Sequence, residues 1–399
     1  MVKTVMRGNE ATAKGAQLCR PHVIPAYPIT PSTMFPERIS EYVADGELKA
    51  EFVMVESEHS AMSAAIGAAA TGVRVCTATA SQGLELMHEI LFIASGMRLP
   101  IVMAVGNRAL SAPINIWCDH QDTISARDCG WLQFYAERNQ EALDLMIMGF
   151  KIGEDKRVLL PGMVGLDAFV LTHTQEVVDV PDQAEVDAFL PPYKPEHTFL
   201  DPKRPVTIGS FATPDTYMEF RFAQDIAMSK EAPKVIDEVF KQWEKAFGRK
   251  YQKVTAFECK DADIIIVSMG SMTGTAREAV RQLRAKGKKV GLCKITVLRP
   301  FPEKELKEVL AGAKVVAVLD RSLSLGYGGP VYCEIAGSFV NDQKRPMIQD
   351  FIIGLGGRDI LIKDFENIVS KCEATMKSGR PEKVIDWINV NYEPAGGVK

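Results

Sequence analysis

The sequence predicts an α/β protein with two doubly wound, mostly parallel-sheet domains. Short apolar strands alternate with helices along most of the 399 residues, and such alternation implies crossover connections and parallel pairing. The uninterrupted apolar runs at 264–267 and 315–319 fit strands that are covered on both faces of a sheet. A chain of this length has room for two or three domains of about 100–200 residues each.

In the first half of the chain, apolar spacing and turn residues define the expected elements. Helices are expected at 9–18, 34–44, 60–71, 84–95 and 139–154, and strands at 23–27, 52–55, 73–76, 101–105, 133–136 and 158–164. Two prolines keep the segment after 23–27 out of a helix. The polar and aromatic connection 110–127 is expected to be a functional loop, because long connections are more often functional than plain connectors.

The second half begins with a change of composition near Val180. Clustered prolines between 181 and 214 indicate a wrapping linker. Beyond them, helices are expected at 232–247, 275–286 and 303–310, and strands at 263–267, 289–296 and 315–319. The tail after 381 is expected to be loose.

The composition argues against several classes of function. A formal net charge of −4 with interspersed signs leaves no basic surface for nucleic acid. The eight cysteines include no CxxC pair, so neither an iron–sulfur run nor a zinc ribbon can be drawn, and they are expected to be reduced cytosolic thiols. No secretory h-region and no apolar run of about 18 residues is found, so we expect a cytoplasmic protein without a membrane segment.

Short motifs for nucleotides, metals and serine hydrolysis are not found. The glycine-rich runs 326–329 and 354–357 lack the strand and helix context of a dinucleotide site and are expected to be turns that need positive φ. Cys118 and His120 could ligate a metal, but no further ligand lies at useful spacing, so no metal site is expected. The chain also lacks the GxSxG elbow of many serine hydrolases.

The stretch from 52 to 108 places polar side chains just past the ends of strands, where ligands bind in open parallel sheets. Glu58 follows a strand and precedes a helix of small residues, so burial there would raise its pKa and let it share a proton with a bound base. Equally, Glu58 could only favour the positive end of the helix dipole. The residues alone leave both interpretations open.

Two further residues could bind a carboxylate at this edge. The guanidinium of Arg108, after the strand 101–105, could form a bidentate pair that lysine cannot reproduce, or it could form a surface ion pair. Thr30 lies between two prolines and could donate to the same carboxylate or only stabilise its turn.

Several motifs in the same order resemble the α subunit of 2-oxoacid:ferredoxin oxidoreductases, and most closely the pyruvate members. They extend over nearly the whole chain, which makes the resemblance more specific than any one motif. They are YPITPS at 27–32, ESE at 56–58, TATASQGL at 77–84, GNRALSAP at 106–113, DHQD at 119–122, VSMGS at 267–271, RPFP at 299–302 and LDRS at 319–322.

The resemblance implies thiamine diphosphate chemistry and a division into domains. Residues 1–250 would be the pyrimidine-binding domain, with a Pro-rich wrapping linker at about 181–250, and 255–385 the transketolase C-terminal-like domain, followed by a loose tail at 386–399. Glu58 falls where the family places the glutamate that bonds N1′ of the aminopyrimidine, although Glu56 lies close enough to be confused with it. The family contacts the substrate carboxylate at the positions of Thr30 and Arg108.

By the same resemblance, four further residues belong to the cofactor site: Pro28, Ile29, Ser81 and Gln82. The chain contains no GDG segment for a diphosphate-bound metal. A β subunit is therefore expected to supply the diphosphate–Mg²⁺ half. The [4Fe-4S] clusters would lie on β or on a ferredoxin-like δ subunit. A γ subunit would take part in the handling of coenzyme A, and ferredoxin would accept the electrons.

The resemblance thus implies that pyruvate and coenzyme A are converted to acetyl-CoA and carbon dioxide, reversibly. A branched-chain or other 2-oxoacid is the alternative substrate, because Thr30 and Arg108 read only the carboxylate. A non-catalytic scaffold subunit, and a transketolase or decarboxylase without electron transfer, are alternatives from other classes.

Overall fold

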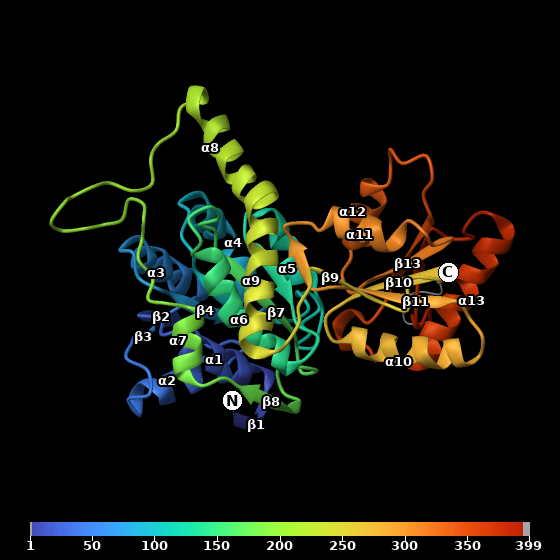
Figure 1. Cartoon of the computed structure of the whole chain (residues 1–399), viewed down its shortest axis with the longest axis horizontal. Helices are drawn as coiled ribbons and strands as arrows, with labels where there is room; N and C mark the ends of the chain where they lie inside the picture. Colours follow the sequence, from blue (N-terminus) through green and yellow to red (C-terminus); the bar gives the residue numbers. More distant parts are fainter. Residues whose placement is uncertain (1, 394–399) are drawn as a thin grey trace.

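The computed structural model describes residues 2–393 and contains two large sheets that lie side by side (Figure 1). The first sheet has the strand order β12-β6-β7-β5-β4. Its strands are β4 (Cys76–Thr79), β5 (Val102–Asn107), β6 (Leu132–Tyr135), β7 (Gly162–Asp167) and β12 (Val297–Arg299). The neighbours among β4 to β7 are parallel, and β12 pairs antiparallel with β6 at the edge. A strand from late in the chain thus completes the early sheet.

The second sheet has the order β15-β14-β13-β10-β11-β9. Its strands are β9 (Val254–Phe257), β10 (Ile264–Met269), β11 (Val290–Ile295), β13 (Val315–Asp320), β14 (Met347–Ile352) and β15 (Ile385–Trp387). Only β9, at one edge, pairs antiparallel with its neighbour. The strands β10, β11 and β13 are buried throughout, as expected for a parallel sheet covered on both faces.

Helices cover both faces of each sheet, so the predicted doubly wound α/β fold is confirmed. One core of the first unit involves α1 (Gly8–Leu18), α2 (Met34–Ala44), α6 (Asn139–Gly153) and α9 (Ala232–Phe247). The opposite core involves α3 (Glu58–Ala70) and α4 (Ser81–Gly96). In the second unit, α10 (Met272–Ala285) and α13 (Ile362–Ser378) pack on one face and α11 (Glu303–Leu310) and α12 (Pro330–Ser338) on the other.

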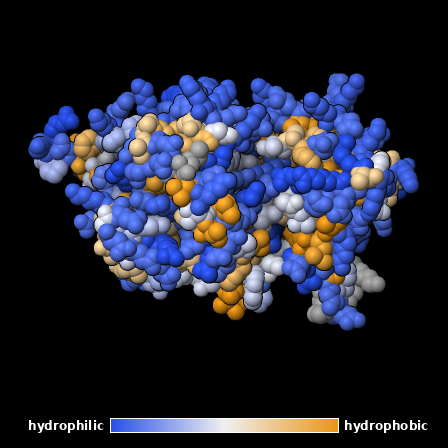
Figure 2. All heavy atoms as spheres, turned by 60° about the horizontal axis from the view of Figure 1, so that its bottom comes forward, coloured by the Kyte–Doolittle hydropathy of each residue, from blue (hydrophilic) through white to orange (hydrophobic). Residues whose placement is uncertain are grey.

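Two strand pairs flank the first sheet. β2 (Val23–Ala26) and β3 (Glu51–Met54) are parallel, and a bridge from Val23 to Val75 joins them to the strand β4. β1 (Val2–Arg7) and β8 (Gln175–Val180) form an antiparallel pair, with Val5 opposite Val177 and both side chains exposed. Figure 2 shows that hydrophilic side chains cover most of one face of the molecule, with apolar side chains in separate groups.

The segment expected to be a wrapping linker is partly helical. It contains α7 (Gln183–Phe189), and α8 (Pro214–Ile226) begins at its last proline. A π-helical turn, Ala227–Glu231, joins α8 to α9, and Figure 1 shows α8 projecting from the body of the molecule. None of the helices described between residues 2 and 393 is long and apolar enough to span a membrane.

The structure corrects two predicted boundaries near the sheet edge. The strand expected at 73–76 is instead β4, so Thr77 and Thr79 lie in the strand rather than after it. Thr77 Oγ1 donates to Pro25 O at 2.7 Å, which satisfies its hydroxyl inside the fold. The helix expected at 84–95 begins already at Ser81, so Gln82 and Gly83 belong to the first turn of α4 rather than to a preceding turn.

Other local predictions have mixed outcomes. The positive φ expected in the glycine-rich runs is found at Gly326, Gly328, Gly354, Gly356 and Gly357. The tail expected to be loose from 386 instead contributes β15, whose residues pair with β14, while 394–399 lie outside the described residues. Sequence reasoning also missed β1, β8, β12, β14, α12 and α13, together with the short helix α5 (Gln121–Ser125) inside the expected loop.

Two buried carboxyl groups face each other, those of Asp320 at the end of β13 and Asp350 within β14. A Cβ atom placed on Gly329 would lie 2.1 Å from Asp320 Oδ2 and 2.6 Å from Asp350 Oδ1, so these oxygens are close neighbours. Burial and the charge of Asp350 raise the pKa of Asp320 to about 8, and burial raises the pKa of Asp350 to about 6. The pair therefore binds protons more tightly in the folded chain than in the unfolded chain.

We expect the wild-type protein to lose thermal stability as the pH rises from 6 to 8.5, because the stabilising proton is lost as the pH passes the raised pKa values. The variant Asp350→Asn should lose less thermal stability over this pH range, since Asp320 then faces a neutral amide. The expected difference in melting temperature is about 2 °C or more, measured by circular dichroism at both pH values. Asp261→Asn is the control, because Arg284 holds the pKa of that exposed carboxyl below its ordinary value. If the melting temperature changed with pH by the same amount in wild type and Asp350→Asn, the pairing of the two carboxyl groups would be contradicted.

Candidate functional site

The candidate site lies at the carboxyl ends of β2, β4 and β5, where α3 and α4 begin. Ser57 caps α3 by accepting from Ser60 N at 3.2 Å, and Glu58 is the first residue of this helix. Glu58 is only 7% exposed. It therefore lies both at a helix N-terminus and in a setting with little water, so the two interpretations of its position are compatible. Glu56, two residues earlier, is exposed and accepts from Ser60 Oγ at 2.7 Å. Burial therefore separates the two glutamates.

Gly83 lets the first turn of α4 pack directly against the carboxylate of Glu58. A Cβ atom on Gly83 would lie 2.7 Å from Glu58 Oε1 and 2.5 Å from Thr79 Oγ1. The hydroxyl of Thr79 is fully buried and has no hydrogen-bond partner among the described residues. Since buried hydroxyl groups are normally paired, this atom is available to a ligand. The carboxylate of Glu58 and this hydroxyl are therefore two polar groups that lie next to Gly83.

The segment 28–33 brings Thr30 to the same edge. Ser32 Oγ donates to Thr79 O at 2.7 Å and accepts from Gly106 N at 3.2 Å, which fixes the segment on β4 and β5. The side chain of Thr30 is exposed, and its carbonyl accepts from Arg108 Nη1 at 2.9 Å. The structure thus brings together Thr30 and Arg108, which lie 78 residues apart in the chain.

Arg108 is buried without a carboxylate partner. Its guanidinium is 7% exposed and donates to two backbone carbonyls, Thr30 O at 2.9 Å and Asn115 O at 3.0 Å. Among the described residues no carboxylate oxygen lies within ion-pair distance of it. Burial lowers its pKa, and the charge of Asp122 opposes this. A buried guanidinium in this state favours an anionic ligand.

The carboxylate of Asp122 organises the edge, and sequence reasoning gave it no role. Its Oδ2 accepts from Ser81 N and from Arg108 N, both at 3.0 Å, and its Oδ1 accepts from Asn107 Nδ2 and Thr123 N. Burial raises its pKa to about 6 despite these hydrogen bonds. Asp122 therefore joins the start of α4 to the end of β5. A carboxylate directly before a β-branched residue in the DHQD run was the available signal.

The other predicted cofactor residues are placed differently from one another. Ser81 is fully buried, and its Oγ lies 2.6 Å from Ala109 O and 2.7 Å from Gln82 Oε1, so its side chain is engaged within the protein. Pro28 is exposed, and Ile29 and Gln82 are half-buried at the edge. The side chain of Ser81 thus holds neighbouring groups of the protein, and the contacts of all four residues with a ligand stay a prediction.

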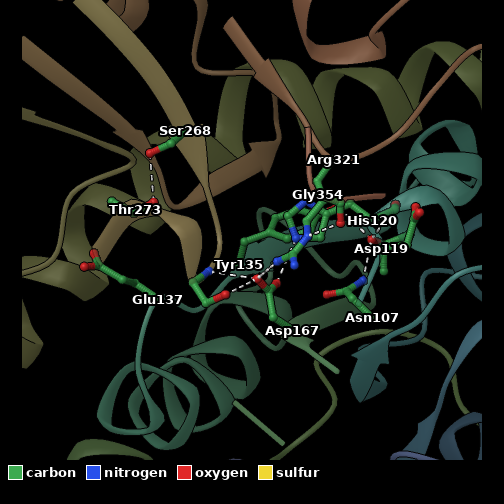
Figure 3. A network of polar contacts seen from close by, with 12 residues as sticks. Asn107, Asp119, His120, Tyr135, Glu137, Asp167, Ser268, Thr273, Arg321 and Gly354 are labelled. Atoms are coloured by element: carbon green, nitrogen blue, oxygen red, sulfur yellow. Dashed lines mark hydrogen bonds and ion pairs between the residues drawn. The ribbon is translucent and has the colours of Figure 1, made fainter. Parts of the chain in front are cut away.

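A second polar network joins this edge to the second sheet (Figure 3). Asp167, at the end of β7, accepts from Arg321 Nη1 at 2.8 Å and from Ser271 N at 3.0 Å, and its Oδ1 lies 2.8 Å from His120 Nε2. Burial would raise the pKa of Asp167, but His120, Arg321 and Ser271 hold it well below its usual range. Cys118, His120 and Asp167 lie together, yet Arg321 on the same carboxylate opposes a metal ion there.

Family comparisons cover most of the chain. The model described as "Pyruvate flavodoxin/ferredoxin oxidoreductase, thiamine diP-bdg" matches residues 14–241, and "Pyruvate:ferredoxin oxidoreductase core domain II" matches 262–365. The pyruvate synthase subunit PorA of Pyrococcus furiosus is 57% identical over 392 residues, which are 98% of this chain and 99% of the relative. The ketoisovalerate oxidoreductase subunit VorA of Pyrococcus horikoshii is 46% identical over 98% of both chains.

Two solved structures share the fold. The 2-oxoglutarate:ferredoxin oxidoreductase from Magnetococcus marinus, with 2-oxoglutarate, coenzyme A and succinyl-CoA bound, matches with a TM-score of 0.73 and 19% identity. The match covers 94% of this chain and 65% of that one. A split-gene transketolase, described as an inactive β4 tetramer, matches with a TM-score of 0.55 and 12% identity over 92% of this chain and 98% of that one.

We expect Asp122→Asn to destabilise the protein by about 1–3 kcal/mol, because buried donors would lose their acceptor. Each carboxylate oxygen accepts from two N–H groups, so an amide nitrogen would face two donors in either orientation. Chemical unfolding followed by tryptophan fluorescence measures the change. Asp182→Asn, at the exposed start of α7, is the control. A stability equal to that of wild type would show that Asp122 does not organise the edge.

Proposed function

Because the chain belongs to the family of pyruvate:ferredoxin oxidoreductase α subunits, we propose that its edge residues form one half of a thiamine diphosphate site that binds pyruvate. The protein is a subunit of an oxidoreductase, pyruvate synthase. The reaction joins pyruvate and coenzyme A to give acetyl-CoA and carbon dioxide, and two electrons pass to ferredoxin. The greater identity to PorA than to VorA supports pyruvate over a branched-chain 2-oxoacid.

The observation that carries this proposal is the guanidinium of Arg108, which is buried and, within residues 2–393, donates to backbone carbonyls without a carboxylate partner. A 2-oxoacid presents a carboxylate next to its reacting ketone, so a fixed cation at this edge can bind and orient the substrate. Arg108 keeps unused N–H donors on Nη2, and the exposed Thr30 hydroxyl can donate to the same carboxylate. Together they hold the substrate in one orientation.

Glu58 is proposed to hold a proton at the pyrimidine ring of the cofactor. The Glu58 carboxylate and the unpaired Thr79 hydroxyl lie beside the same residue, Gly83, and as a pair they match the polar edge of an aminopyrimidine in chemistry. When bound, thiamine diphosphate supplies a nucleophilic carbon for the ketone and an electron sink for the decarboxylation. The chain's own contribution is a carboxylate in a water-poor setting, where its hydrogen bond to the ring is strengthened.

The remaining parts of the site are proposed to lie on partner chains. The sequence has no GDG segment for a diphosphate-bound Mg²⁺ and no cluster motif, so we assign Mg²⁺ and the diphosphate to a β subunit. We assign the [4Fe-4S] clusters to β or to a ferredoxin-like δ subunit. Coenzyme A is proposed to bind to the assembled complex, which includes a γ subunit. Exposed apolar side chains near the edge, those of Met54 and Leu86, support a covering partner.

A cytoplasmic location completes the proposal. All eight cysteines are free, six of them buried, which suits a reducing compartment. Scaffolding without catalysis is less favoured, because a scaffold has no need of a buried guanidinium that has no carboxylate partner among the described residues.

In the assembled complex, Glu58→Gln should lower pyruvate-dependent viologen reduction by about 10²–10⁴-fold, because the proton at the ring can no longer be shared with a carboxylate. Glu56→Gln is the matched control, since that exposed side chain only accepts from Ser60. Melting temperature should match wild type for both variants. Loss of activity in Glu56→Gln with normal activity in Glu58→Gln would reverse the assignment.

Arg108→Gln should raise the KM for pyruvate by roughly 100-fold, because a charge-assisted contact to the carboxylate is lost. Arg98→Gln is the matched control. Arg98 precedes β5, at the opposite end of the strand from Arg108, and likewise donates to two backbone carbonyls, Leu159 O and Val158 O. Steady-state kinetics with saturating coenzyme A measure the change. Similar KM values in the two variants would argue against substrate binding by Arg108.

A further inference from the structure

The segment that follows Arg108 is fastened to the second domain. His120 N donates to Arg321 O at 2.8 Å, and Gly357 N donates to Cys118 O at 2.7 Å. Asp119 Oδ2 accepts from Gly356 N at 3.2 Å. Three hydrogen bonds therefore connect residues 118–120 to the second sheet and to the glycine-rich turn 354–357. This turn lies about 240 residues later in the chain than the substrate site.

Asn115 connects this turn to the guanidinium of Arg108. Its carbonyl accepts from Arg108 Nε at 3.0 Å, and its Nδ2 donates to Gly356 O at 3.0 Å. Its Oδ1 accepts from Trp117 N at 2.8 Å, so the side chain is fixed at both ends. The neighbouring residues 111–114 are exposed, with Ile114 at 78%, and offer little packing of their own. The side chain of Asn115 is therefore a main constraint on the position of its carbonyl.

The turn is shaped to receive Asn115. Gly356 has φ +60°, and a Cβ atom there would lie 2.6 Å from Asn115 Nδ2. Gly357 has φ +80°, and its Cβ would lie 2.3 Å from the Cβ of Trp117. Any side chain at these positions would be strained and would push the segment 115–117 away. This close approach explains why glycines occur at these positions of the turn.

We propose that Asn115 is a positioning residue, through which the turn 354–357 of the second domain sets the plane of the Arg108 guanidinium and thereby the affinity for the substrate carboxylate. This inference rests on the proposed role of Arg108. A guanidinium binds a carboxylate well only when its plane is fixed, and here two carbonyls fix it. Thr30 supplies one from the first domain. Asn115 supplies the other, and the second domain holds it.

The test uses the assembled complex carrying Asn115→Ala, Gly356→Ala or both. Each single variant should raise the KM for pyruvate by about 10-fold, the effect of one lost hydrogen bond in a buried site, and change kcat by less than about threefold. The KM for coenzyme A should stay unchanged. The double variant should resemble the single ones, because both act through the same contact.

Gly379→Ala is the matched control. It also has a positive φ, +73°, in the second domain, but a Cβ atom there meets nothing within 4 Å. It should lower stability without changing the KM for pyruvate. Additive effects of Asn115→Ala and Gly356→Ala, or a fall in kcat with unchanged KM, would overturn the inference.

Combination with Arg108→Gln separates this inference from the proposed function. If Arg108→Gln raises the KM, Asn115→Ala should add nothing in that background. A raised KM in Arg108→Gln with normal values in Asn115→Ala and Gly356→Ala would overturn the positioning role alone. A normal KM in Arg108→Gln would instead overturn the proposed substrate contact.

Discussion

The carboxylate of Asp167 is the point at which the two halves of the molecule meet. It ends β7 of the first sheet, and it accepts from Arg321 and Ser271, which follow strands of the second sheet. A buried ion pair of this kind adds little net stability compared with apolar packing, but breaking it leaves a buried charge. The ion pair therefore serves to fix the relative position of the two sheets. Only one relative placement of the two sheets pairs Asp167 with the guanidinium of Arg321 and the backbone N–H of Ser271.

That placement reaches the candidate site through one short segment. His120 lies against Asp167, and the carboxylate of Asp122, two residues later, binds the backbone N–H groups of Ser81 and Arg108. The start of α4 and the end of β5 thus depend on a segment that the second domain also holds. The first sheet carries the groups proposed to bind ligands, and the second sheet limits how far they can move.

The fold was predictable because the sequence pattern that indicates it occurs many times. Apolar strands and amphipathic helices recur along the chain, and α9 and α11 have the bounds that their apolar spacing predicts. Boundaries near the site were wrong where tertiary contacts replace local ones. Thr77 and Thr79 suggest a loop by their hydroxyls, but Thr77 is satisfied by Pro25 O, and β-branched residues suit a strand. The strand β12 was missed because its partner β6 lies more than 150 residues earlier.

The site was predictable in part, because some of its residues are placed by the strands that precede them. Glu58, Thr30 and Arg108 follow strands, so position in the sequence places them at one edge. Asp122, Asn115 and Asp167 act through partners that only the folded chain supplies, and no spacing rule connects Asn115 to Gly356. Their common feature is that each fixes a backbone group or a largely buried charged side chain. Arg108 shows the consequence, because its guanidinium donates to backbone carbonyls and has no carboxylate in direct contact among the described residues, so an anionic ligand can still pair with it. Precise placement by both domains therefore turns a buried charge, normally a cost to folding, into a binding site.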